Sequence, residues 1–206
     1  MRAWSLFISG FFHPIFMPFY VVLLAFLLRP IDLMFLPPAV QLFVLLQVLV
    51  MATLLPMGAV LVFVRLGRLS SVMAEERHER NLPYLVQALC LASLIFSFRN
   101  NGLPALLTEL IVGALVAVLA SWFINRRWKI SAHGVGMGGM LGFLWAMHAR
   151  TEYTMMLPLA AAILLAGAVG TARLYLQAHR PAQIYTGFLV GFASMGLVLL
   201  GYWVNL

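Results

Sequence analysis

The clearest chemical pattern in the sequence is a group of basic and imidazole side chains at the edge of an apolar stretch. Arg173 is followed after five residues by His179, and His179 is followed after three residues by Gln183. A phosphate group that is partly removed from water needs several fixed cations and donors around its oxygens, and arginine offers a planar fork of donors. Basic side chains beside an apolar segment therefore favour anionic headgroups or phosphates as partners.

A second histidine stands at the start of another apolar stretch, in the run Ile130-Ser131-Ala132-His133. Backbone amides at the N-terminus of a helix point toward anions. We therefore expect Ser131 and the amides beside it to offer further donors to the same phosphate.

These two segments together resemble the type 2 phosphatidic acid phosphatase family. The family's third signature is Ser-Arg, five residues, His, three residues, Asp, and Arg173, His179 and Gln183 stand at the matching spacing. Its second signature, Pro-Ser-Gly-His, is similar to residues 130–133. The two partial matches follow in the family's order and cover roughly the second half of the chain.

The resemblance implies a role for each matching residue. His179 would attack phosphorus and become a phosphohistidine, His133 would protonate the leaving alkoxide, and Arg173 would hold the phosphoryl oxygens. It also implies a helical bundle acting on a phosphatidate-like or polyprenyl (di)phosphate lipid, with no metal and no cofactor. Further phosphate contacts are expected from Arg77, Arg80, Lys129 and Ser131.

The chain departs from the family at Gln183, which replaces the aspartate that orients the nucleophile. An amide can hold one imidazole tautomer, but it cannot stabilise imidazolium as a carboxylate does. The family's first signature is absent, and its nearest substitute is residues 75–83. A noncatalytic lipid-phosphate binder or carrier therefore stays open as an alternative.

A third alternative is a magnesium-dependent prenyl or alcohol-phosphate transferase. Glu75 and Glu79 are four residues apart, so on a helix they would share one face and could bind magnesium. In a segment that mixes glutamates and arginines, however, the glutamates more often form ion pairs with the neighbouring arginines. Several arginines have an equally ordinary interpretation as anchors that reach lipid headgroups: Arg77, Arg80, Arg126, Arg127 and Arg180.

The composition places all of these residues in a membrane protein. Of 206 residues, 64% are hydrophobic and 9% are charged, whereas a soluble domain carries about 25% charged residues. The formal charge of +7 would suggest nucleic acid for a soluble protein. Here the cations lie in short loops beside apolar segments, so we expect the bilayer and lipid phosphates as partners and no nucleic acid.

A bilayer-spanning helix needs about 20 apolar residues, and we expect seven such helices in one domain, residues 1–206, without a cleaved leader. The segments are 4–28, 39–64, 84–98, 103–124, 131–148, 153–176 and 183–204. With seven crossings, one side holds ten Lys and Arg residues and the other holds Arg29, Arg99 and Arg150. Cytoplasmic loops are enriched in these residues. We therefore expect the N-terminus and the site on the cytoplasmic side of a bacterial-type cytoplasmic membrane, and the C-terminus outside.

Other notable residues fit a structural role. Gly134, Gly138 and Gly142 are spaced four apart, which lets transmembrane helices approach closely. Glu109 lies inside an apolar segment, where an ionisable group is costly, and we expect it to be packed, hydrogen-bonded or protonated and away from the site. His13 also lies in an apolar segment, and the sequence assigns it no partner. The single cysteine, Cys90, excludes an internal disulfide framework and is expected to serve packing.

Overall fold

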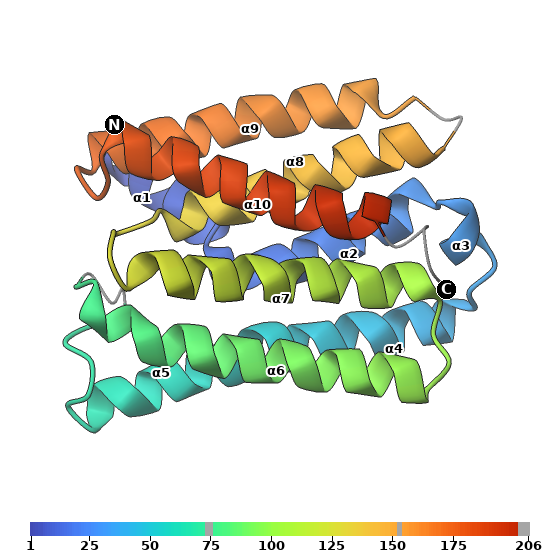
Figure 1. Cartoon of the computed structure of the whole chain (residues 1–206), viewed down its shortest axis with the longest axis horizontal. Helices are drawn as coiled ribbons and strands as arrows, with labels where there is room; N and C mark the ends of the chain where they lie inside the picture. Colours follow the sequence, from blue (N-terminus) through green and yellow to red (C-terminus); the bar gives the residue numbers. More distant parts are fainter. Residues whose placement is uncertain (73–75, 152–153, 202–206) are drawn as a thin grey trace.

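The computed structural model is a bundle of helices that run roughly alongside one another (Figure 1). The structure describes residues 1–72, 76–151 and 154–201. The predicted all-helical class is confirmed. Its ten α-helices in these ranges are α1 (Arg2–Phe11), α2 (Met17–Leu28), α3 (Ile31–Met34), α4 (Pro38–Val48), α5 (Leu55–Arg65), α6 (Asn81–Asn100), α7 (Ala105–Asn125), α8 (Ala132–Arg150), α9 (Met156–Tyr175) and α10 (Pro181–Gly201).

Six helical segments of the described chain are long and apolar enough to cross a bilayer. They are Arg2–Leu28, Pro38–Arg65, His78–Asn100, Ala105–Asn125, Met156–Tyr175 and Pro181–Gly201. The sequence predicts a seventh at 131–148, and this segment forms α8, a helix of 19 residues. The five glycines and two histidines of α8 lower its hydropathy. The described chain therefore has six candidate spans and one further long helix.

The first apolar segment is not one continuous helix. Helix α1 ends at Phe11, a single 3₁₀ turn covers Pro14–Phe16, and α2 begins at Met17. The imidazole Nδ1 of His13 accepts a hydrogen bond from the backbone N–H of Ile15 and caps this turn. Proline has no backbone N–H and clashes with the preceding turn of a helix. The His13-Pro14 pair therefore breaks the segment.

The second apolar segment is helical throughout but has a wider turn in its middle. Residues Leu49–Leu54 form a π-helical stretch between α4 and α5. It lies directly before Pro56, whose missing N–H disrupts the regular ladder of hydrogen bonds.

Helices α8 and α10 pack most closely in the bundle, because glycines on both helices allow their backbones to come into contact. A side chain at Gly187 would meet the carbonyl oxygen of Ser131 at 2.6 Å, and one at Gly134 would meet the carbonyl oxygen of Ile184 at 2.7 Å. At Gly138 and at Gly191 the added carbon would likewise strike backbone atoms of the opposite helix. The structural role expected for the glycines is confirmed.

A buried ion pair links α7 and α8 near the start of α7 and the end of α8. Arg150 on α8 donates to the carboxylate of Glu109 on α7 at 2.8 Å and to the carbonyl oxygen of Leu199 on α10 at 3.3 Å. Glu109 is 4% exposed. Glu109 is therefore hydrogen-bonded and away from the basic loops, as expected. Its partner is the guanidinium of Arg150.

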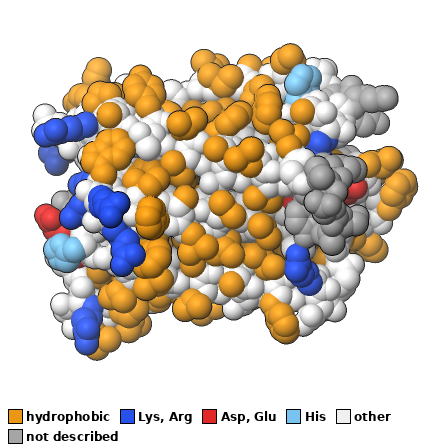
Figure 2. Space-filling model, viewed as in Figure 1, with side chains coloured by type: hydrophobic (Ala, Val, Ile, Leu, Met, Phe, Trp, Pro, Cys, Tyr) orange, Lys and Arg blue, Asp and Glu red, His pale blue; other side chains and the backbone are white. Residues whose placement is uncertain are grey.

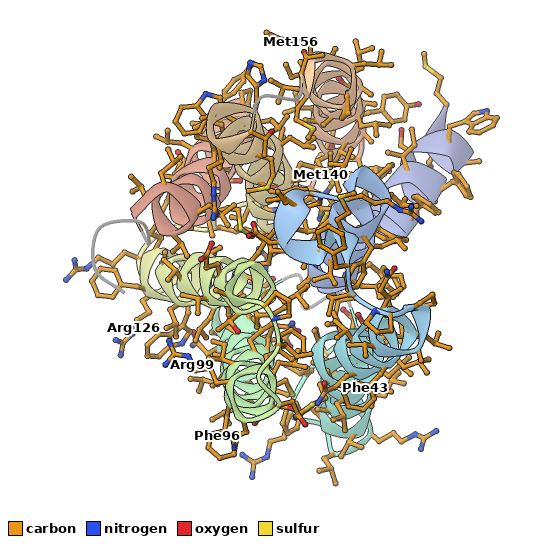
Figure 3. The ribbon with its side chains drawn as sticks, turned by 90° about the vertical axis from the view of Figure 1, so that its right-hand side faces the viewer. Phe43, Phe96, Arg99, Arg126, Met140 and Met156 are labelled. Atoms are coloured by element: carbon orange, nitrogen blue, oxygen red, sulfur yellow. The ribbon has the colours of Figure 1, made fainter. Side chains whose placement is uncertain are left out.

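The outer surface of the bundle is apolar. Looking along the helices, Phe96 and Met156 point outward while Met140 lies among the helices (Figure 3), and their exposed fractions are 69%, 59% and 7%. Lys and Arg side chains gather mainly at one end (Figure 2). This is the end where α1 begins and where α5–α6, α7–α8 and α9–α10 are connected (Figure 1). The three basic loops therefore share one end of the bundle.

Candidate functional site

The loop between α9 and α10 folds back sharply and carries His179. The N–H of Ala178 donates to the carbonyl of Arg173, and the N–H of Gln177 donates to the carbonyl of Leu174. Gln177 has φ of +53°, so the chain ends α9 with the left-handed residue of a Schellman motif. Pro181 then starts α10 at a position where its missing N–H costs nothing. These two signals return the chain so that His179 lies against both helix ends.

Gln183 determines the tautomer of His179. The side-chain oxygen of Gln183 lies 3.2 Å from Nδ1 of His179 and 3.0 Å from the backbone nitrogen of Arg180. The N–H of Arg180 can only donate, so the Gln183 atom that it meets is the oxygen. Nδ1 of His179 must then carry the proton. Its Nε2 keeps the lone pair that a nucleophile needs.

Three cations act on His179 from different parts of the chain. Arg80 lies at the start of α6, Lys129 lies in the α7–α8 connection and Arg173 lies in the last turn of α9. His179 is 7% exposed. Burial first, and then the positive charges of Arg80, Arg173 and Lys129, lower the pKa of His179 to about 4, although the hydrogen bond to Gln183 opposes this. His179 is therefore neutral at neutral pH, in a strongly positive environment.

His133 lies next to this group at the start of α8. Its Nε2 lies 2.9 Å from the carbonyl oxygen of Ser9 on α1, and a carbonyl can only accept, so Nε2 carries a proton. The guanidinium of Arg173 interacts electrostatically with His133 and with His179. The positive charge of Arg173 therefore acts on both histidines that the sequence singles out, His133 and His179.

His13 is a site residue that the sequence does not assign. Its ring meets the ring of His133 edge to face, with centroids 5.5 Å apart, and Arg173 acts on it electrostatically. The available signal was an ionisable residue before a proline inside an apolar span. What the sequence lacked was the partner, because His133 is 120 positions away.

The other residues expected to contact phosphate, Arg80, Ser131 and Arg77, form hydrogen bonds within the protein. Arg80 donates to the carbonyl oxygen of Ile130 at 3.1 Å and acts electrostatically on the hydroxyl of Tyr84. Ser131 is fully buried, and its hydroxyl oxygen accepts the N–H of Gly134 as the N-cap of α8. Arg77 is exposed and donates to the carbonyl of Arg127 at 2.5 Å. Arg77 thus holds a loop rather than facing His179.

The acidic stretch has a turn-forming role at Glu79. Its carboxylate accepts the backbone N–H of Ser70 at 2.7 Å and the Ser70 hydroxyl at 3.0 Å. Glu75, the other residue of the possible magnesium pair, lies outside the described residues. The carboxylate of Glu79 is therefore turned toward its own loop.

A hollow of about 480 Å³ gives His179 a path to the outside of the bundle. Its walls include Lys129, Arg180, Gln183 and His179 itself. A phosphate group that entered this hollow would meet the neutral imidazole of His179 together with Lys129 and Arg180.

We expect the imidazole of His179 to titrate near pH 4 in NMR spectra of the labelled protein, well below the ordinary value of 6.5. Arg80→Ala should move the midpoint upward because it removes a nearby positive charge. Arg65→Ala, at an exposed position on α5, is the matched control and should leave it unchanged. Since the pKa is lower in the folded state, the contribution of His179 to stability is complete above about pH 6.5 and is lost as pH falls toward 4. A midpoint at 6.5 in the wild type would contradict this environment.

Comparisons of the chain with protein-family models, with curated proteins and with solved structures found no match.

Proposed function

We propose that this protein binds a phosphate ester carried by a membrane lipid and cleaves or transfers the phosphoryl group through a phosphohistidine at His179. The observation that supports this most directly is the fixed tautomer of His179. Its Nδ1–H is held by Gln183 while Nε2 keeps a lone pair, and three cations act on the ring electrostatically. A nucleophile beside fixed positive charge is the arrangement that phosphoryl transfer requires.

The proposed chemistry balances as two displacements. Nε2 of His179 forms a bond to phosphorus while the bond from phosphorus to the ester oxygen breaks. The leaving alkoxide takes a proton that the adjoining pair His133 and His13, whose rings are in contact, takes up when the anionic phosphate binds. Water then attacks the phosphohistidine: its oxygen bonds to phosphorus, the bond from phosphorus to Nε2 breaks, and the proton released by the water returns to the histidine pair. This step releases phosphate and restores His179. Arg173, Arg80 and Lys129 neutralise the phosphoryl oxygens throughout.

The second candidate function is a noncatalytic binder of lipid phosphate, and the uncharged Gln183 is the observation that favours it. Phosphate release from purified protein with a panel of lipid phosphates separates the two candidates. The same assay with a chelator tests the magnesium-dependent alternative, because only that enzyme would lose activity. Release that is insensitive to chelator supports the proposal.

We place the site on the cytoplasmic side, since ten of the thirteen Lys and Arg residues belong to loops expected there. Labelling of a cysteine at position 127 by an impermeant reagent from outside intact cells, with none at position 150, would reverse this orientation.

Gln183→Glu is expected to raise phosphate release several-fold to a hundredfold. The change keeps the side-chain length, so the oxygen can still meet Nδ1 of His179, and the carboxylate adds a charge that stabilises the imidazolium. A charge-assisted hydrogen bond of this kind contributes about 1 to 3 kcal/mol. The pKa of His179 should rise in parallel, which NMR titration would show.

Gln183→Leu is the matched control for that substitution. It removes the acceptor, so His179 loses its fixed tautomer, and release should fall below that of the wild type. Equal release by the glutamate, leucine and wild-type proteins would show that Gln183 does not orient a nucleophile.

A further inference from the structure

We propose that an apolar cavity inside the bundle holds a single hydrocarbon chain of the substrate, so that the preferred lipid phosphate is a one-chain alkyl or prenyl phosphate. This inference rests on the proposed function. The cavity lies among α2, α7, α8 and α10, and its lining is almost wholly apolar, with Ser121 and Tyr84 as the polar exceptions.

One end of the cavity adjoins the candidate site. Pro14 and Ala132 line it, and these residues directly follow His13 and precede His133. Tyr84 also lines it, and Arg80 acts electrostatically on its hydroxyl. We therefore place the ester carbon of a bound phosphate at this end of the cavity.

The cavity continues away from the site into the apolar part of the bundle. Its wall on α7 extends from Ser121 to Leu110, and at about 1.5 Å per helical residue this is roughly 16 Å. Met195 on α10 lies at the far end with Leu110 and Gly113. The lining therefore follows the helices for about three turns, and the space that it encloses is narrow.

The volume of the cavity limits how many hydrocarbon chains of a lipid it can hold. The cavity measures about 90 Å³, which is less than the roughly 150 Å³ apolar cavity that accommodates one benzene. It therefore has room for part of one chain and none for a second chain beside it. Glycine and alanine create the space, at Gly113, Ala114, Ala117, Gly136 and Gly139.

The test uses non-hydrolysable alkyl phosphonates of increasing chain length, with the protein held in an amphipathic polymer. Binding of these water-soluble probes to the wild type should tighten about fourfold per added methylene, the value expected for burying a CH₂ group, and then level off. Ala117→Phe fills the cavity and should remove this dependence without changing the binding of inorganic phosphate. Val116→Phe adds bulk to an exposed position of the same helix and is the matched control.

A second measurement does not depend on a variant that folds. A short-chain alkyl phosphonate with a photoreactive group at its chain end should label Ser121 or Ala117 of the cavity lining in the wild type. Labelling of only the exposed residues Leu119 and Phe123, or affinity independent of chain length, would overturn the one-chain cavity. So would tighter binding of a two-chain phosphonate. Failure to bind inorganic phosphate would instead reject the proposed function, so the two failures are distinguishable.

Discussion

Replacing His179 by alanine is expected to abolish phosphate release from lipid phosphates. The substitution removes the only atom that the proposal lets bond to phosphorus, Nε2, which the contact of Nδ1 with Gln183 leaves unprotonated. Loss of a nucleophile of this kind should reduce the rate at least about a thousandfold, or about 4 kcal/mol of transition-state stabilisation. The measurement is phosphate release under single-turnover conditions, together with covalent labelling of the protein by radiolabelled substrate.

His78→Ala is the matched control, because His78 is an exposed histidine at the same end of the bundle. It should retain both release and labelling. Unchanged release by His179→Ala would reject the phosphohistidine. If the wild type releases no phosphate, and Arg173→Ala abolishes lipid-phosphate binding, the binder takes the place of the enzyme.

Replacing Gly191 by alanine is expected to destabilise the bundle strongly. The added methyl would strike the carbonyl oxygen of Val135 and the backbone nitrogen of Gly139, and backbone atoms cannot turn aside as a flexible side chain can. Overpacking typically costs about 1 to 3 kcal/mol, and a collision between two backbones belongs at the upper end. With about 2 to 4 °C per kcal/mol for a chain of this size, the thermal midpoint should fall by about 6 to 12 °C.

Gly167→Ala on α9 is the matched control, since nothing lies within 4 Å of the added carbon there. It should leave the midpoint unchanged or raise it slightly, because alanine favours a helix more than glycine does. Thermal unfolding of both variants is monitored by tryptophan fluorescence. Equal shifts of the thermal midpoint in the two variants would show that the contact between α8 and α10 does not limit stability.

The sequence by itself determined the class of the protein and most of its helices. Apolar runs of about 20 residues leave the backbone no alternative to internal hydrogen bonds, so seven long helical segments could be located before the structure was known. The outer bounds expected for the first two segments agree closely with the structure, but the irregular turns inside them, at His13-Pro14 and before Pro56, were not located. The exact number of membrane crossings does not follow from hydropathy, because α8 is long but comparatively polar.

The sequence also singled out Arg173, His179 and Gln183 of the candidate site, which lie at the adjoining ends of α9 and α10. Chain order does not reveal which residues from other helices meet them. His13 could not be matched with His133, nor could Arg80 be preferred to Arg77. Those partnerships depend on how helices pack.

Only the tertiary structure decided the tautomer of His179, the commitment of Ser131 to the N-cap of α8 and the ion pair between Glu109 and Arg150. It also decided where an apolar cavity remains between the helices. Each of these depends on distances of a few ångströms between atoms far apart in sequence, set by the contacts that glycines allow between α8 and α10. Hydrophobic pattern specifies which surfaces are buried, and close packing specifies which atoms meet.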